Sequence, residues 1–250
     1  MLRHRDERLV IVQSDAETTL ALAEIAWLII DTPQASISDA LVAALAEHGV
    51  MMIVADAGHH PVGVLSPPVR AVRTTIGEQL WVGLSQALAT ARMRNQANLL
   101  RQLREPLHDA RVRRSAPSLF STFAHGMLSD RRGALLRYGE AVARAALIRA
   151  CAAAGLVIAA REDRVDALLG PVRPFLDRAA HRQSLGGIGT SLSLDDRQRM
   201  AAPLGEVAMI GDRRMPLLAA IGAMTMSIAR AARQGDAALV AIPSLPPVTA

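Results

Sequence analysis

The sequence contains no lysine and very few aromatic residues. Aromatic side chains make up 2% of the 250 residues, whereas hydrophobic residues make up 51%. The core must therefore consist of Ala, Leu, Val, Ile and Met, which favours a mainly helical body because Ala and Leu are strong helix formers. All 28 basic residues are arginines, whose planar, permanently charged guanidinium suits bidentate contact with phosphate. A net charge of +5 and a pI near 10.9 allow a nucleic-acid partner, although a GC-rich genome would also produce many Ala and Arg residues.

Cysteine is almost absent, and so are long hydrophobic runs. Cys151 is the only cysteine, which excludes a disulfide within the chain and a thiolate zinc site, and we expect it to be a small buried residue. The first residues lack the apolar stretch of a signal peptide. The apolar windows at 144–160 and 216–230 are interrupted by arginines and short for a membrane span. We therefore expect a cytoplasmic protein that makes no membrane contact.

The pattern of apolar residues predicts an α+β fold, with a small N-terminal β-rich domain followed by a larger all-α domain. Short runs in the first part of the chain predict strands at 9–12, 27–30, 50–55 and 61–65, with the segment 18–22 between the first two and a helix at 40–48. Ser-Pro-Pro at 66–68 breaks this pattern, so we place the first domain at 1–68.

The second domain is predicted to extend over 74–241. Thr75 and Glu78 fit a capping box that begins a helix running to about residue 103. Further helical patterns follow at 133–154, 164–180, 195–200 and 216–233. The last residues, 242–250, contain three prolines and are predicted to form a disordered tail.

Five segments, in order along the chain, resemble the family of CRISPR-associated protein one, the integrase of CRISPR adaptation. One segment contains Arg-Asn-Gln, as a basic helix of the family does. Another is Leu-Arg-Tyr-Gly, where the family has Leu-Asn-Tyr-Gly. A third is Gly-Pro-Val-Arg-Pro-Phe-Leu-Asp, which is similar to the family's Glu-Pro-Phe-Arg-Pro-Leu-Val-Asp. The five segments are 35–50, 91–97, 134–139, 170–177 and 215–221. Residues 8–31 match from partway into the family's β-domain, so we expect the start of that domain to be truncated.

The resemblance implies a metal-dependent reaction on DNA. Members of the family cleave or transesterify phosphodiesters with Mg²⁺ or Mn²⁺, held by carboxylates on two helices and a histidine between them in sequence. A divalent metal activates the attacking oxygen and neutralises charge on the phosphate. Such hard cations require oxygen-rich ligands in near-octahedral geometry.

The positions that match the family's metal ligands have lost them. His108 occupies the first carboxylate position, with Asp109 beside it, and the loop that would carry the histidine is deleted. The carboxylates of the last helix are replaced by Gly170 and Ala167. We therefore expect no bound metal, no intact catalytic residue and no cofactor. The candidate substitute ligands are Asp109, Asp163 and Asp166.

A DNA-binding surface is the other implication of the resemblance. The candidate contact residues are Arg92, Arg94, Asn95, Arg101, Arg104, Arg111, Arg113, Arg114, Arg137, Tyr138 and Arg173. The alternative is that the arginines form solvated helix faces without a nucleic-acid role.

The family's assembly implies a homodimer, bridged by the companion CRISPR-associated protein two, on a prespacer or branched duplex. Three functions stay open at this point. The chain is a catalytically inactive DNA-binding protein of spacer acquisition, an active endonuclease or integrase with substituted ligands, or an eroded relic.

Overall fold

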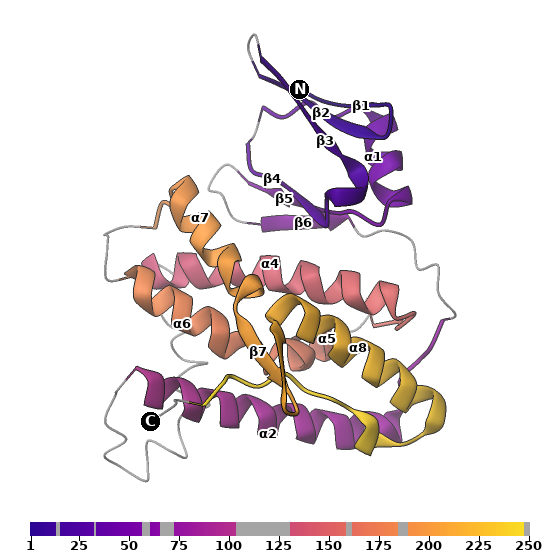
Figure 1. Ribbon diagram of the computed structural model, residues 1–250, viewed down its shortest axis with the longest axis vertical. Coiled ribbons are helices and arrows are strands. Elements are labelled where there is room, and N and C mark those ends of the chain that lie inside the picture. Colours follow the sequence, from indigo (N-terminus) through magenta and orange to yellow (C-terminus); the bar gives the residue numbers. More distant parts are fainter. Residues whose placement is uncertain are drawn as a thin grey trace. The chain divides into compact units, whose positions relative to one another are not determined.

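The computed structural model divides the chain into two compact units, Met1–Ala71 and Val72–Ala250. The first unit is rich in strands, whereas the second is mostly helical (Figure 1). This arrangement confirms the predicted α+β class. The structure describes residues 1–13, 16–32, 34–56, 61–65, 73–103, 131–158, 162–184 and 190–247.

Unit 1 contains two three-stranded sheets. The first has the order β1 (Leu2–Arg5), β2 (Arg8–Gln13) and β3 (Ala16–Ala21), with both pairs antiparallel. The second has the order β4 (Trp27–Ile30), β5 (Met51–Ala55) and β6 (Pro61–Leu65). Strands β4 and β5 are parallel, and the connection between them contains α1 (Asp39–Glu47). Parallel neighbours need such a crossover, which a helix commonly supplies.

The core of unit 1 forms around α1. Leu41 and Leu45 of this helix pack with Leu9 of β2 in one buried cluster. The Ser38 hydroxyl accepts a hydrogen bond from the Leu41 backbone N–H and caps the helix. Gly49 follows the helix with φ +69°, a conformation that glycine adopts without steric cost.

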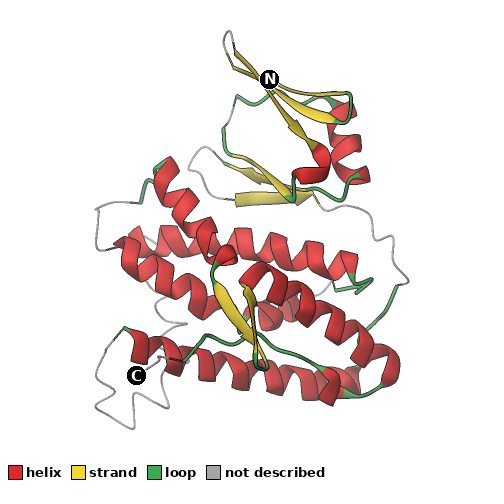
Figure 2. Cartoon of the chain, viewed as in Figure 1, coloured by secondary structure: helices red, strands yellow, loops and turns green. Residues whose placement is uncertain are grey.

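Unit 2 is a helical body with one β-hairpin in its described part (Figure 2). Its helices are α2 (Glu78–Gln102), α4 (Arg131–Ala153), α5 (Glu162–Leu169), α6 (Arg173–Ser184), α7 (Leu194–Ala201) and α8 (Leu217–Gln234). The hairpin consists of β7 (Val207–Ile210) and β8 (Arg213–Pro216). No helix in the described part of the chain is long and apolar enough to cross a membrane.

Helix α4 is the centre of unit 2, since α5, α6, α7 and α8 all pack against it (Figure 1). Small residues on α4 allow this close packing. A Cβ atom at Gly139 would lie 2.7 Å from the terminal methyl carbon of Met200 on α7, so only glycine fits there without movement. Cys151 is buried on the same helix, as predicted, and burial raises the pKa of its thiol to about 12.

Helix α5 is fixed to the start of α2 by Arg164. Its guanidinium donates to the Ile76 carbonyl oxygen at 3.0 Å, pairs with Glu78, and lies 4.8 Å from the centre of the Trp81 ring. These contacts place α5, and therefore the segment that follows it, at a defined position beside α2.

The C-terminal segment lies along α2 and is held there by three side-chain amides. Asn95 donates to the carbonyl oxygens of Pro243 (3.0 Å) and Pro171 (2.8 Å), and accepts from the Leu245 backbone N–H (3.0 Å). Asn98 and Gln102, farther along α2, donate to the carbonyls of Leu245 and Pro246. In Figure 1 this segment is the yellow strand-like trace beside α2.

The prediction of a disordered tail at 242–250 is therefore wrong for residues 242–247. Ser244 pairs with Met209 of β7 through two backbone hydrogen bonds of 2.9 Å, and Leu245 is 1% exposed. Prolines prevent a helix here, but an extended segment can still receive hydrogen bonds at its carbonyl groups.

The Asn95 amide should be a main determinant of the stability of unit 2. Asn95→Ala leaves three buried backbone groups unpaired, so we expect it to lower the free energy of unfolding by about 2–4 kcal/mol. Asn98→Ala removes a bond of 3.3 Å to Leu245 and an exposed bond from Arg101, both at a half-buried residue, and should cost less than about 1 kcal/mol. Denaturant unfolding of both variants measures this difference, and equal costs would contradict the assigned role.

Candidate functional site

The two positions that should carry metal ligands lie where α5 ends and α6 begins. Ala167 is in the last turn of α5, and Gly170 follows that helix. A Cβ atom at Gly170 would lie 3.0 Å from the Ala167 carbonyl oxygen and 3.5 Å from Cδ of Arg92 on α2. The space beside Gly170 is therefore bordered by an arginine side chain, and neither position offers a ligand oxygen from its side chain.

Asp166, the nearest candidate substitute ligand, already accepts hydrogen bonds from two arginines. Its Oδ1 accepts from Arg144 of α4 at 2.5 Å and from Arg173 of α6 at 3.3 Å. Arg173 also donates through Nε to Glu140 of α4 at 2.9 Å. A metal ion bound to Asp166 would have to displace both guanidiniums, since the same oxygen receives both.

The described residues do not fit a divalent metal ion. No group of three or more His, Cys, Asp or Glu side chains within these ranges could hold one. Asp163 is exposed in the first turn of α5 and has other contacts. His108 and Asp109, the first half of the predicted ligand set, lie outside the described residues.

Asp177 is the buried carboxyl group of this region. It lies on α6, one turn after Arg173, and is 8% exposed. Burial raises its pKa from 3.8 to about 7, while Arg132 lowers it and Glu140 raises it, with smaller lowering effects of Arg92 and Arg173. A pKa this high means that the surrounding arginines do not fully offset the cost of burying the charged carboxylate.

Arg92 of α2 lies beside Gly170 and is half-buried. Its pKa is lowered by burial and by the neighbouring Arg173, against the opposing effects of Asp177 and Glu140. The Arg92 Nε atom is buried and has no hydrogen-bond partner among the described residues. Gln96, one turn farther along α2, is 1% exposed, and within the same ranges neither its Nε2 nor its Oε1 has a partner.

Helices α2, α4, α5 and α6 thus bring seven charged side chains together. We call this set the arginine–carboxylate cluster, and it consists of Arg92, Arg132, Arg144, Arg173, Glu140, Asp166 and Asp177. Sequence reasoning named Arg92, Arg173 and Asp166 as site residues but not the other four, among them Arg144 and Glu140. Their spacing of four residues places both on one face of α4 and was the available signal.

The predicted DNA-binding residues have different environments. Arg94 and Arg101 are exposed on α2, whereas Arg137 of α4 is half-buried and has other contacts. Asn95 and Tyr138 are 0% and 4% exposed, so the expectation of DNA contact is corrected for these two. Arg104, Arg111, Arg113 and Arg114 lie outside the described residues.

An open groove borders Arg94. It has a volume of about 760 Å³ and is lined by α2, by the turn between β7 and β8, and by the C-terminal segment. Gln86, Thr90 and Arg94 contribute from the helix, at spacings of four residues, and Asp212 contributes from the turn. The groove therefore follows one face of α2 and carries charges of both signs.

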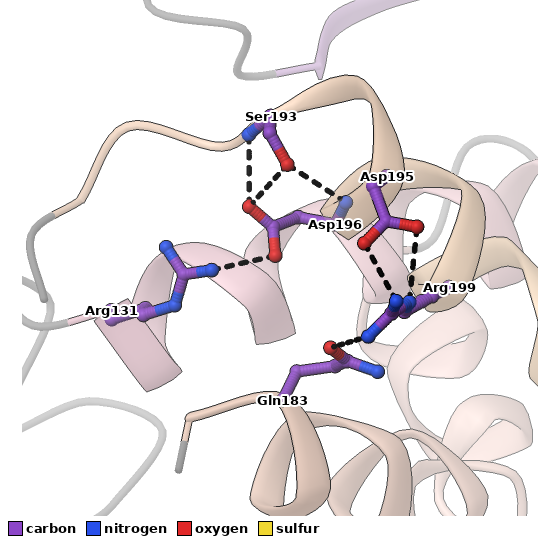
Figure 3. A network of polar contacts seen from close by, with 6 residues as sticks. All are labelled: Arg131, Gln183, Ser193, Asp195, Asp196 and Arg199. Carbon is purple, nitrogen blue, oxygen red and sulfur yellow. Dashed lines mark hydrogen bonds and ion pairs between the residues drawn. The ribbon is translucent and has the colours of Figure 1, made fainter. Parts of the chain in front are cut away.

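A separate polar network fixes the start of α4 against α7. Figure 3 shows Asp196 between Ser193, whose hydroxyl and backbone N–H donate to it, and Arg131, which donates at 2.6 Å. Burial alone would raise the pKa of Asp196, but these hydrogen bonds from Ser193 and Arg131 hold it below its usual value. Arg199 pairs with Asp195 in the same view. The network closes the capping box of α7 and has a structural role.

Several solved structures share the fold of this chain, a β-rich unit followed by a helical unit. A casposase bound to integration product matches with a TM-score of 0.70 at 12% identity, over 94% of this chain and 89% of that one. A Cas1 protein from Thermotoga maritima matches with a TM-score of 0.68 at 8% identity, over 94% of each chain. The structure of a TtCas1–DNA complex gives 0.57 at 14% identity, over 92% and 89%. At these identities the likeness shows the fold alone.

The family is shown by the sequence. The model of the family described as CRISPR associated protein Cas1 matches residues 1–146, more than half of the chain. The chain therefore belongs to the Cas1 family, as its motifs indicated. No curated protein matches it in sequence.

The raised pKa of Asp177 predicts a pH dependence of stability. Because its pKa is about 7 in the folded chain and 3.8 for an ordinary aspartate, the unfolded chain loses this proton first as pH rises. Stability should therefore fall as pH rises from about 4 to about 7, by up to about 4 kcal/mol. Asp177→Asn should remove this term, so that the variant equals the wild type near pH 4 and exceeds it at pH 8. Denaturant unfolding across this range measures the difference, and parallel profiles would contradict the assignment.

Proposed function

We propose that this Cas1-family protein binds DNA in CRISPR spacer acquisition but does not cleave or join it by the family's metal mechanism. One observation carries the proposal. Gly170 and Ala167 occupy the ligand positions of α5 and its end, and the nearby Asp166 is held by Arg144 and Arg173. A divalent ion requires several oxygen ligands, and this half of the site provides none that is free of an arginine.

The exposed arginines of α2 are the proposed contacts to the DNA backbone. Arg94 and Arg101 are seven residues apart and thus lie on the same face of the helix. Arg101 keeps its guanidinium oriented by a hydrogen bond of 2.9 Å to Asn98 Oδ1. Arginine in this setting binds phosphate through several N–H donors without reading the base sequence. Related structures include a casposase bound to integration product and a TtCas1–DNA complex, which supports this role.

The proposed assembly is a homodimer that works with a Cas2 protein in the cytoplasm. Support comes from a Cas6-RT-Cas1–Cas2 complex, whose chain resembles this one with a TM-score of 0.63 at 11% identity. This chain spans 35% of that longer chain. In the proposed role, the protein would hold or position DNA while another subunit carries out the chemistry.

DNA binding should be independent of metal ions and sensitive to salt. We expect a labelled branched duplex to bind equally well in EDTA and in Mn²⁺, without cleavage or strand transfer in either. The double variant Arg94→Gln, Arg101→Gln should weaken binding and lower the slope of log K against log salt by about 2, because two phosphate contacts are lost. Fluorescence anisotropy over a salt series measures this change, and Arg230→Gln, at an exposed site of α8, is the control.

Two results would overturn the proposal. Metal-dependent cleavage would establish an active enzyme and direct attention to Asp109, Asp163 and Asp166 as substituted ligands. A folded protein that neither binds nor cleaves DNA would favour an eroded relic. Circular dichroism and thermal unfolding of the same preparation separate a relic from a sample that has simply failed to fold.

A further inference from the structure

Two buried polar groups on one face of α2 have no partner within the described part of the chain. Arg92 has an unpaired, buried Nε–H, and Gln96, four residues later, has a buried amide that neither donates nor accepts there. Leaving such groups unpaired is costly, and more so for a charged group. Five other arginines of the described chain also have a buried Nε without a partner, whereas Gln96, at 1% exposure, lacks a partner for both of its amide atoms. Since buried polar groups are nearly always satisfied in folded proteins, Gln96 points to a bound group beside Arg92.

The charge of the surroundings indicates an anion. Four arginines of the arginine–carboxylate cluster face three carboxyl groups. One of these, Asp177, has a pKa of about 7 and is therefore only partly ionised at neutral pH. The cluster thus carries an excess of positive charge, and a bound anion would compensate it.

Asp177 and Glu140 attract Arg92, but Gly170 offers no carboxylate on the side of Arg92 that it borders. Arg92 Cδ is 3.5 Å from the position of a Cβ at this glycine, so a glutamate there would bring its carboxylate within reach of the guanidinium. With glycine, no carboxylate from this position reaches Arg92. Two other carboxylates of the cluster are engaged elsewhere, because Glu140 accepts from Arg173 and Asp166 accepts from both Arg144 and Arg173.

A phosphate group has the chemistry that these donors require. It carries negative charge and several acceptor oxygens, whereas Arg92 and the Gln96 Nε2 offer N–H donors one helical turn apart. Arg173 has three further N–H groups beyond the two bonded to Glu140 and Asp166. Charge-assisted hydrogen bonds of this kind are stronger than neutral ones.

We propose that Arg92, Gln96 and Arg173 bind one phosphate group of a nucleic-acid backbone without a metal ion, beside Gly170. The assignment of the phosphate to nucleic acid rests on the proposed function, whereas the anion site itself does not. The positive charge that a divalent ion supplies in the family is supplied here by guanidinium groups of the chain.

The first arm of the test uses inorganic phosphate alone. In EDTA and at constant ionic strength, phosphate should raise the unfolding temperature by a few degrees and the effect should saturate, as for binding to the native state. Arg92→Met should abolish the saturable rise. It should fold like the wild type without phosphate, because methionine keeps the apolar part of this half-buried side chain. Gln96→Leu should weaken the rise, and Arg230→Gln should leave it unchanged.

The second arm identifies the source of the phosphate. If the site binds the nucleic-acid backbone, Arg92→Met should lower the affinity for duplex DNA in EDTA by about tenfold. Unchanged DNA affinity together with a lost phosphate response would assign the site to a free phosphate ion instead. A phosphate response in a protein that binds no DNA would contradict the proposed function while supporting the anion site.

The outcome that overturns the inference is a rise that does not saturate and is equal in wild type and Arg92→Met. Phosphate stabilises many proteins in this nonspecific way by exclusion from their surface. Phosphorus NMR line broadening that is the same for both proteins would lead to the same conclusion. Neither result would bear on DNA binding by Arg94 and Arg101, which the salt series on their double variant tests separately.

Discussion

The compensation of clustered charges without a metal ion is the constraint that shapes the centre of unit 2. Carboxylates that gather at one place need a cation, because isolated buried charges are costly. In a metal-dependent site that cation is the ion. Here Asp166 and Glu140 are compensated by Arg144 and Arg173, and the position that would hold another carboxylate is Gly170. The loss of a metal ligand at Gly170 and the pairing of the remaining carboxylates with arginines therefore belong together, because both balance charge without a metal ion.

The same constraint connects packing to charge. Helices α4, α5 and α6 approach closely, and Arg164 and Asn95 fix α5 and the start of α6 against α2. The charged side chains are therefore held by elements that cannot easily separate. Removing one arginine of the cluster would take away part of the compensating charge, which matters most for the buried Asp177. The cluster is thus a structural feature as well as a candidate binding site.

Much of the fold could be predicted from the sequence, but the failures have physical reasons. The strand at 27–30 and the helix before Gly49 follow directly from apolar runs and caps. Strand β1 was missed because it has only one apolar residue, Leu2, and its turn to β2 uses Asp6 and Glu7 at positive φ without a glycine. The predicted helix 164–180 is two helices, since Gly170 and Pro171 interrupt the pattern.

The site was harder to predict, because a motif identifies a position but not its exposure. The registers of Gly170 and Ala167 followed from the prolines and arginine of one segment. Asn95, in contrast, belongs to a motif that suggested DNA contact, yet its amide is used up by backbone groups of Pro171, Pro243 and Leu245. No local pattern reveals a partner almost 150 residues away in sequence.

Exposed and buried arginines contribute differently to binding of the same phosphate backbone. Salt screens Arg94 and Arg101, so these residues would add affinity that depends strongly on ionic strength. Arg92 is held in a partly desolvated setting beside Arg173, where screening is weaker and geometry is fixed. A single phosphate bound there would define where the duplex lies, while the exposed arginines attract it from solution. A protein that positions DNA without cleaving it needs both kinds of arginine. The exposed arginines supply affinity, but affinity alone does not place a particular phosphate at a particular point.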